Sequence, residues 1–286
     1  MMEVIPLTGG LGAEIFGADL RKEADFPQIQ EAFAKYSVIV MRGQTITPDD
    51  QIRFAGRFGP VSHNRFLRPL DGHPGIVEVL KEKHHKEAIG EVWHADETYD
   101  EIPSLGSILH GIELPPYGGD TMFASMGAAY EALSPAMQDF LQGLSAWHGS
   151  AHNFGRASAD RESRRDGRIG NFDQVKDDVL HPVVIRHPLS GRKCLYVNPG
   201  FTLRIEGLEK AESAALLAFL YDHCKQPEFH CRVRWRAGDV TMWDNRAVWH
   251  KALNDYHGFR RYMHRITVQG CALEPARGDA RRTAVA

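Results

Sequence analysis

The sequence predicts a mainly β fold with flanking helices, built as an antiparallel barrel or jelly roll. Two features support this prediction. Short runs rich in β-branched and aromatic residues follow one another in the second half of the chain, separated by turn residues. These runs do not alternate regularly with helices, as the strands of a parallel sheet would. The helical stretches are therefore expected to form an outer layer.

The first expected elements are a helix, a strand and a second helix. Phe26 to Tyr36 has apolar residues at helical spacing, and Ser37 to Met41 has the composition of a buried strand. Thr47-Pro48-Asp49-Asp50 combines an N-cap residue, a proline at the first helical position and two acids in the first turn. A helix is therefore expected to begin there and to run to Phe58.

Two further helices and a series of strands follow. Ser134-Pro135 repeats the same start signal, and Leu208 to Cys224 is strongly helical. The expected strands cover residues 183–186, 194–197, 240–243, 247–250 and 260–268, with turns at 188–191, 244–246 and 254–258.

Residues 1–286 are expected to form a single domain, because no repeat and no linker rich in Pro, Gly or Ser divides them. Within this domain, residues 150–178 are polar and have few periodic apolar positions, so we expect a lid or a mobile loop there. The tail 274–286 is expected to be frayed.

Composition and charge argue against several classes of protein. The chain has 43% hydrophobic and 25% charged residues, which is ordinary for a globular domain, and a net charge of −3. That charge gives no field to gather nucleic acid, and acids dilute the run Arg161 to Arg168. The opening residues do not resemble a secretory signal, and no stretch approaches about eighteen uninterrupted apolar residues. A cytoplasmic protein with no nucleic-acid or membrane partner is therefore expected.

The cysteines and the outer helices lead to two further expectations. Cys194, Cys224, Cys231 and Cys271 are widely scattered, with no CxxC pair, so neither a disulfide framework nor a thiolate zinc site is expected. Helices on the outside of such barrels often pair, so a homo-oligomer, either a dimer or a tetramer, is expected.

The first candidate for chemistry is His94-Ala95-Asp96. On a strand, residues at i and i+2 project from the same face, so both side chains could reach one metal ion. Val92-Trp93 and Thr98-Tyr99 favour such a strand, but with fifteen histidines in the chain the pair needs a third ligand. His85-Lys86-Glu87 offers a similar pair. Its polar surroundings, residues 81–87, predict an exposed loop, which argues against it.

His250 is the candidate for the third ligand. It ends the expected strand after the turn at 244–246, and the next turn leads back into 260–268 as a hairpin. This hairpin would bring Arg261 and Arg265 towards the metal. The two arginines share a face of their strand, where they either bind anions inside the barrel or face solvent.

Two histidines and one carboxylate would leave three positions open on an octahedral ion. This arrangement suits an oxygen-activating Fe(II) enzyme, whereas zinc usually prefers a closed or nearly closed tetrahedral shell. A 2-oxo acid can take two open positions through its keto oxygen and C1 carboxylate. Its far carboxylate needs a bidentate cation, which a guanidinium supplies better than an ammonium.

Six blocks of residues are far more restrictive than the His-x-Asp pair. They are Trp93-His94-Ala95-Asp96, Pro116-Tyr117-Gly118-Gly119-Asp120-Thr121, His181-Pro182-Val183-Val184, Tyr196-Val197-Asn198, Trp243-Asp244-Asn245-Arg246 and Arg261-Tyr262-Met263-His264-Arg265. With these blocks the sequence resembles the taurine dioxygenase and 2,4-dichlorophenoxyacetate dioxygenase family, from Leu7 to about Gly270.

The resemblance implies a double-stranded β-helix (jelly roll, cupin-like) and an Fe(II)- and 2-oxoglutarate-dependent dioxygenase. Such an enzyme uses O₂ to convert 2-oxoglutarate to succinate and CO₂ while it hydroxylates a small anionic substrate next to a heteroatom, which releases a cleaved product. The resemblance places iron on His94, Asp96 and His250, and 2-oxoglutarate on Thr121 and Arg261. The Thr121 role agrees with its chemistry, because a hydroxyl can donate to a carboxylate oxygen.

The resemblance also implies that Arg265 faces the anionic group of the substrate and that Tyr99 and Phe201 wall the substrate pocket. Taurine or another alkylsulfonate is favoured, and aryloxyalkanoates (2,4-dichlorophenoxyacetate or dichlorprop type) and alkyl sulfate esters are the alternatives. The places of a histidine and an asparagine in taurine-specific relatives correspond here to Asn64, with His63 one residue off, and to Gly90.

Two other classes of protein would use similar residues. A barrel that binds zinc or manganese without oxidising a substrate would have the metal ligands but no need for Arg261 and Thr121, so binding of 2-oxoglutarate separates it from a dioxygenase. A scaffold protein would tolerate loss of the three metal ligands.

Overall fold

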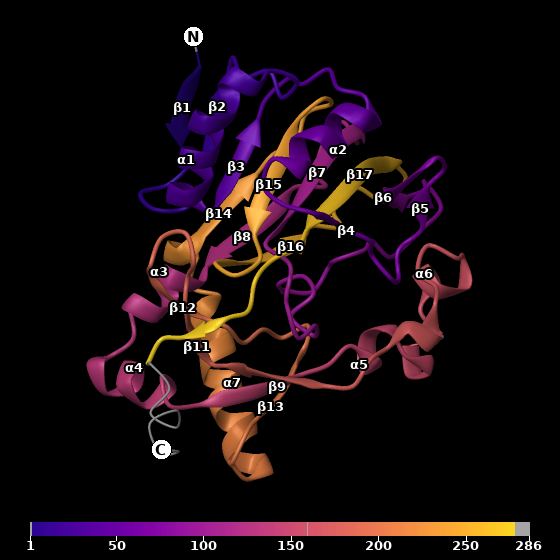
Figure 1. Ribbon diagram of the computed structural model, residues 1–286. Coiled ribbons are helices and arrows are strands. Elements are labelled where there is room, and N and C mark those ends of the chain that lie inside the picture. The colour runs from indigo at the N-terminus through magenta and orange to yellow at the C-terminus, as the bar shows by residue number, and fades with distance from the viewer. Residues whose placement is uncertain (1, 159, 278–286) are drawn as a thin grey trace.

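The computed structural model describes residues 2–158 and 160–277, and its strands build the expected β-rich jelly roll (Figure 1). The large sheet is ordered β1 (Glu3–Pro6), β2 (Ala13–Phe16), β3 (Val38–Met41), β15 (Val240–Asp244), β7 (Gly106–Glu113), β17 (Arg261–Val268), β6 (His73–Lys81) and β5 (Pro69–Leu70), and β4 (Val61–Ser62) also pairs with β17. The facing sheet is ordered β14 (His230–Val233), β8 (Thr121–Ser125) and β16 (Val248–Ala252).

Two smaller sheets extend the jelly roll at one end. They are ordered β10 (Val179–Pro182), β9 (Ser145–His148), β13 (Thr202–Ile205), and β12 (Lys193–Leu195), β11 (Val184–Arg186), β18 (Glu274–Pro275). The α-helices are α1 (Phe26–Tyr36), α2 (Pro48–Gly56), α3 (Met126–Glu131), α4 (Pro135–Leu141), α5 (Ala151–Phe154), α6 (Glu162–Arg165) and α7 (Lys210–Cys224). Short 3-10 helices are η1 (Glu23–Asp25), η2 (Arg156–Ser158), η3 (Phe172–Gln174) and η4 (Pro227–Phe229).

The centre of the large sheet is buried on both faces, and β3 shows how its sequence achieves this. All four residues of β3 are buried; Val38 and Val40 pack into the cluster between the two main sheets, whereas Ile39 and Met41 pack on the other side with α1 and α2. Side chains of a strand alternate between faces, so a continuous apolar run suits a strand that is covered twice. The predicted helices α1 and α2 therefore form an outer layer.

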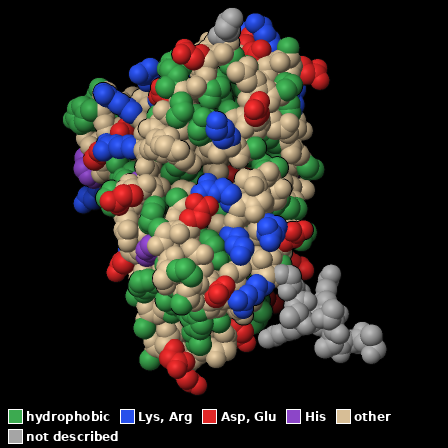
Figure 2. Space-filling view, turned by 90° about the vertical axis from the view of Figure 1, so that its left-hand side faces the viewer, with side chains coloured by type: hydrophobic (Ala, Val, Ile, Leu, Met, Phe, Trp, Pro, Cys, Tyr) green, Lys and Arg blue, Asp and Glu red, His purple; other side chains and the backbone are tan. Residues whose placement is uncertain are grey.

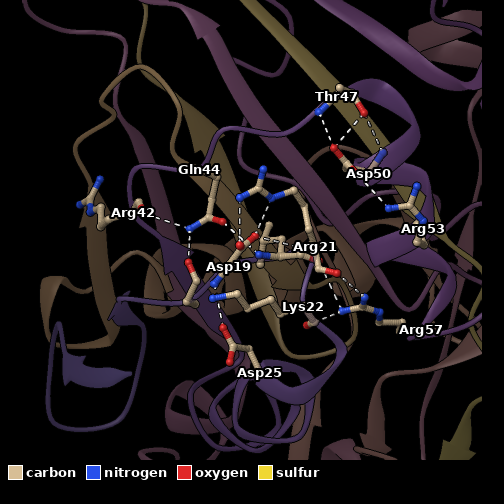
Figure 3. Close-up of polar contacts among 12 residues, drawn as sticks. Asp19, Arg21, Lys22, Asp25, Arg42, Gln44, Thr47, Asp50, Arg53 and Arg57 are labelled. Carbon is tan, nitrogen blue, oxygen red and sulfur yellow. Dashed lines mark hydrogen bonds and ion pairs between the residues drawn. The ribbon is translucent and has the colours of Figure 1, made fainter. Parts of the chain in front are cut away.

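The N-terminus of α2 follows the sequence prediction closely. The Thr47 hydroxyl accepts a hydrogen bond from the Asp50 backbone (3.2 Å), and the Asp50 carboxylate accepts one from the Thr47 backbone (3.0 Å). Figure 3 shows these contacts together with the Asp50 ion pair to Arg53 at 2.8 Å. Such a cap contributes about 0.5–2 kcal/mol. The helix ends at Gly56, two residues before the expected Phe58.

The expected hairpin of the strands around His250 and Arg261 is wrong. β16 pairs with β8, whereas β17 pairs with β6, β7 and β4, so residues 253–260 cross from one main sheet to the other. His250 lies in the middle of β16 and does not end it. A turn sequence specifies where the chain reverses, but it does not specify which sheet the next strand joins. Both strands are largely buried, and such strands have no sequence pattern that identifies their partner.

Two of the irregular segments lie together. Residues 82–90 form a loop as expected, but Lys81 and His85 are buried, with 2% and 8% exposure, instead of exposed. The segment 150–178 covers them: Glu162 accepts hydrogen bonds from the backbone of Lys86 and Glu87, and Arg168 donates to the backbone oxygens of Leu80 in β6 and of Glu87 in the loop. This segment contains α5, α6, η2 and η3. That it moves as a lid stays a prediction.

The C-terminal tail was expected to fray from residue 274. Residues 274 and 275 instead form β18 beside β11, and Ala276 is buried. Residues 278–286 lie outside the described part of the chain. On the face shown in Figure 2, acidic and basic side chains are interspersed, in keeping with the net charge of −3. Among the helices that the structure describes, none has both the length and the apolar character needed to cross a bilayer.

The histidines on β7 and β17 predict a loss of stability in acid. His110 and His264 lie directly opposite each other and are 7% and 8% exposed. Burial, with His264 nearby, lowers the pKa of His110 from 6.5 to about 4, and burial also lowers that of His264. The unfolded chain therefore binds more protons between pH 6.5 and about 4, so stability should fall as the pH falls through that range.

The expected loss from His110 is on the order of 1–3 kcal/mol. Urea unfolding at pH 7.5 and pH 5 would measure it in the wild type and in His110→Gln, which cannot titrate there. A pH difference that is equal in the two proteins would show that His110 does not contribute.

Candidate metal centre

The structure brings His94, Asp96 and His250 together at one point between the two main sheets. Their candidate ligand atoms all lie within 4.8 Å of one another. His94 Nε2 is 3.6 Å from Asp96 Oδ1, and His250 Nε2 is 3.8 Å from Asp96 Oδ2. Two imidazoles and a carboxylate converge, as the sequence predicted, although they come from segments about 150 residues apart.

His94 and Asp96 do not lie on a regular strand, so that part of the prediction is wrong. His94 forms an isolated two-way bridge with His250, with N···O distances of 3.1 and 2.7 Å, and a turn begins at Asp96. Glu97 has a left-handed φ of 55°. Strain of this kind in a non-glycine residue is typical of functional sites. The bridge and the turn together aim the three side chains at a common point.

Contacts around the three side chains fix their orientation. The Nδ1 atom of His94 lies 2.7 Å from the carbonyl oxygen of Val92, to which an Nδ1–H would donate, and this tautomer leaves the Nε2 lone pair free for a metal. Ser107 donates to Asp96 Oδ2 at 2.7 Å, and Arg265 Nη1 lies 3.3 and 3.4 Å from the two carboxylate oxygens. These contacts pre-organise the carboxylate.

Burial and charge tune the protonation of the same groups. Burial alone would raise the pKa of Asp96, but Arg265 and His250 hold it well below its usual range. Burial and the neighbouring His94 lower the pKa of His250 well below its usual value. The site therefore presents a carboxylate and a neutral imidazole at neutral pH, which are the protonation states that a metal requires.

A second part of the site surrounds Arg261 and Thr121. Arg261 is 5% exposed, and neither its Nε nor its Nη2 has a hydrogen-bond partner in the described part of the chain. Trp235 Nε1 donates to the Thr121 hydroxyl at 3.0 Å, so the hydroxyl hydrogen remains available to another acceptor. A buried guanidinium without a partner is costly unless an anion binds it. These residues fit the far carboxylate of a 2-oxo acid.

A cavity of about 370 Å³ opens beside the metal ligands. Arg265 lines it, and so do Asn64, Tyr99 and Phe201, three of the residues expected to contact substrate. The remaining one, His63, is exposed and does not line the cavity. Apolar side chains of the 82–92 loop and the 150–178 segment also line it, with Ile89, Val92, Phe154 and Ile169 among them, and so do the charged side chains of Glu87, Glu91 and Arg161.

Several residues that complete the site were not predicted from the sequence. Phe154 stacks on Phe66, with ring centroids 4.2 Å apart, and also reaches Tyr99. Glu97 accepts a hydrogen bond from Asn64 at 3.3 Å, and burial raises its pKa to about 7. Phe154 lies in a segment without regular periodicity, and Glu97 is one acid among many. No sequence feature distinguished either residue.

Comparison with known proteins finds relatives over nearly the whole chain. The family model described as "Taurine catabolism dioxygenase TauD, TfdA family" matches residues 3–267. An alkylsulfatase from Acinetobacter baylyi is 35% identical over 284 residues, which cover 97% of this chain and 88% of that protein. An alpha-ketoglutarate-dependent sulfate ester dioxygenase from Pseudomonas putida is 34% identical, covering 99% of this chain and 94% of that protein. The crystal structure of a taurine dioxygenase from Burkholderia xenovorans superposes with a TM-score of 0.79 at 33% identity, covering 95% of this chain and 92% of that one.

Proposed function

This chain belongs to the taurine catabolism dioxygenase TauD, TfdA family and is a 2-oxoglutarate-dependent dioxygenase, and we propose that His94, Asp96 and His250 hold its iron while Arg261 and Thr121 hold its cosubstrate. The observation that carries this assignment is the buried Arg261 guanidinium, which has two nitrogens without a partner among the described residues. An anionic ligand would supply the missing acceptors.

When bound, iron and 2-oxoglutarate supply the oxidation: with O₂, the cosubstrate becomes succinate and CO₂, and one oxygen atom enters a C–H bond of the substrate. The chain's own residues position the reactants. Arg261 and Thr121 orient the far carboxylate of the cosubstrate, and Ser107 keeps the Asp96 carboxylate in one orientation. Apolar residues such as Phe154 keep water out of the cavity.

We propose that the substrate is an alkyl sulfate ester or an alkylsulfonate, the latter group including taurine. Arg265 lines the cavity next to Asp96 and provides a cation for the three oxygens of either head group. The apolar residues of the cavity suit an alkyl chain. Hydroxylation of the carbon that bears the sulfate oxygen or the sulfonate sulfur gives an unstable product, which collapses to an aldehyde with release of sulfate or sulfite.

Aryloxyalkanoates are a second candidate class, favoured by one observation. Tyr99, Phe154 and Phe201 form an aromatic cluster in the cavity, with ring centroids between 4.8 and 6.0 Å apart. Such rings could pack on an aryl group. Measuring 2-oxoglutarate-dependent O₂ uptake with hexyl sulfate, hexanesulfonate, taurine and dichlorprop would decide between the classes. Turnover of dichlorprop alone would overturn the organosulfur proposal.

Arg265→Gln tests the head-group assignment. We expect the transition-state stabilisation derived from kcat/KM for the sulfate or sulfonate substrate to fall by about 2–3 kcal/mol, because the head group loses a charge-assisted contact. Since Arg265 also contacts Asp96, iron binding must be measured in the same preparation. Unchanged kcat/KM with a full complement of iron would remove Arg265 from the substrate site.

A further inference from the structure

Lys81 is a buried cation that the metal centre and the proposed cosubstrate contacts leave unexplained. It is the last residue of β6 and is 2% exposed, and its Nζ atom is buried without a hydrogen-bond partner among the described residues. Nζ lies 4.6 Å from the ring centroid of Tyr256. A cation–π contact recovers about 0.5–2 kcal/mol, less than it costs to remove an ammonium from water. The contact with Tyr256 alone does not explain why a lysine lies here.

The strand register places Lys81 directly opposite Arg261. Directly opposed residues of an antiparallel pair project from the same face, so the two side chains leave the sheet from neighbouring positions on the face where Arg261 points inward. Tyr256 is near both side chains: its ring centroid is 4.6 Å from Lys81 Nζ, and a Cβ added at Gly119 would come within 3.2 Å of Tyr256 Cδ1 and 3.3 Å of Arg261 Cδ. Like charges in this arrangement destabilise a sheet unless an anion is bound beside them.

The acids in the neighbourhood are used elsewhere. Glu91 and Glu162 act electrostatically on Lys81, but neither forms an ion pair with it in the described part of the chain. The Glu162 carboxylate accepts from two backbone amides and from Arg168, and the Glu91 carboxylate accepts from Asn254 at 2.8 Å. Asp120 acts electrostatically on Arg261 but is paired with Arg232. Neither Lys81 nor Arg261 therefore has an ion-pair partner of its own within these residues.

We propose that Lys81 is a second cosubstrate-binding residue, whose ammonium shares the far carboxylate of 2-oxoglutarate with Arg261. This inference rests on the proposed binding of that carboxylate by Arg261. The guanidinium gives the carboxylate a fixed, bidentate partner, whereas the ammonium on its flexible stem adds a point charge. Tyr256 holds the stem in place. Bound 2-oxoglutarate would thereby give both buried cations a counter-ion.

The test is the affinity for 2-oxoglutarate of Lys81→Met, measured by anaerobic titration of the Fe(II) protein and followed by tryptophan fluorescence and calorimetry. Methionine keeps the length of the side chain and removes the charge. We expect the Kd to rise about tenfold or more. The apo variant should be at least as thermostable as the wild type, because it no longer buries an unpaired charge, and its Tm should rise less on addition of 2-oxoglutarate.

Two controls make the result specific. Lys83→Met removes an exposed lysine two residues away and should leave the Kd unchanged. Lys81→Arg keeps the charge and should bind within a few-fold of the wild type, which guards against a folding defect in the methionine variant. Binding of 2-oxobutyrate, which lacks the far carboxylate, should not respond to any change at Lys81.

The outcomes separate this proposal from the one on which it rests. If the wild type binds 2-oxoglutarate and Lys81→Met binds it equally well, Lys81 is a structural residue and the inference is overturned. If Lys81→Met and Lys81→Arg weaken binding equally, the charge is not what matters and the inference is again overturned. If the wild-type protein fails to bind 2-oxoglutarate, the proposed function itself fails.

Discussion

Replacing Asp96 with alanine is expected to abolish stoichiometric iron binding, and turnover with it. Asp96 provides the only carboxylate of the three converging side chains. This carboxylate forms an ion pair with Arg265 and accepts a hydrogen bond from Ser107. Without it, two neutral imidazoles remain to bind a hard, oxygen-preferring ion, with a cation 3.3 Å from the lost carboxylate's position. We expect the Fe(II) affinity to fall more than about a hundredfold. Anaerobic Fe(II) titration followed by metal analysis measures this loss.

The same substitution should leave the protein folded but less stable. It removes the acceptor of the Ser107 hydroxyl and the partner of the buried Arg265, at a cost of about 1–3 kcal/mol in the free energy of unfolding. Asp100→Ala is the matched control, since Asp100 lies four residues away and also pairs with an arginine, Arg65, at 2.7 Å. Asp100→Ala should lose stability and keep iron. Full iron binding by a folded Asp96→Ala protein would contradict the metal-site assignment.

Local signals in the sequence predicted local structure well. The capping residues around Thr47 and the apolar spacing from Phe26 to Tyr36 located the start of α2 and both ends of α1, because caps and periodicity act over a few residues. The strands later assigned as β11, β15 and β17 were also predicted within one or two residues. These elements depend on short-range patterns, which a single sequence contains.

Pairing between distant strands could not be predicted in the same way. The chain reverses after His250 as expected, yet β16 and β17 belong to opposite sheets. Two largely buried strands look alike in sequence whichever partner they have, because regular alternation of polar and apolar residues marks only strands with one face in water. The burial of Lys81 was likewise not predictable, since the residues near it are distant in the sequence: Arg168 donates to the carbonyl of the neighbouring Leu80, and Tyr256 lies against the ammonium.

The candidate site contains residues that could be predicted from the sequence and residues that could not. His94, Asp96, His250 and Arg261 were predicted because their residue types suit a single reaction and together resemble one family. Glu97, Ser107 and Phe154 were not, because each became meaningful only when the fold brought it against a ligand or into the cavity. The reacting groups are therefore easier to predict from a sequence than the groups that hold them in place.

Replacing Arg261 with glutamine is expected to weaken the binding of 2-oxoglutarate by about 2–4 kcal/mol, which raises its Kd roughly 30- to 1000-fold. Of the arginines on β17, Arg261 is the one whose guanidinium lies beside Thr121 and Trp235. The buried Nε and Nη2 atoms of this guanidinium lack hydrogen-bond partners within residues 2–158 and 160–277. A glutamine would leave the far carboxylate of the cosubstrate largely uncompensated in a buried site. Anaerobic titration with 2-oxoglutarate measures the change.

The stability of Arg261→Gln without cosubstrate distinguishes a ligand-binding arginine from a structural one. Arg246 is also buried, but it donates twice to Asp244, so Arg246→Gln should cost about 3–5 kcal/mol of folding free energy. Arg261 makes no such ion pair among the described residues, and burial lowers its pKa, so its charge opposes folding until an anion binds. The apo form of Arg261→Gln should therefore be as stable as the wild type.

Arg260→Gln is the matched control, because Arg260 is the adjacent arginine and pairs with Glu82 and Glu113. This change should leave the Kd for 2-oxoglutarate unaltered. A large loss of apo stability in Arg261→Gln with an unchanged Kd would assign the guanidinium to the fold and remove it from the cosubstrate site.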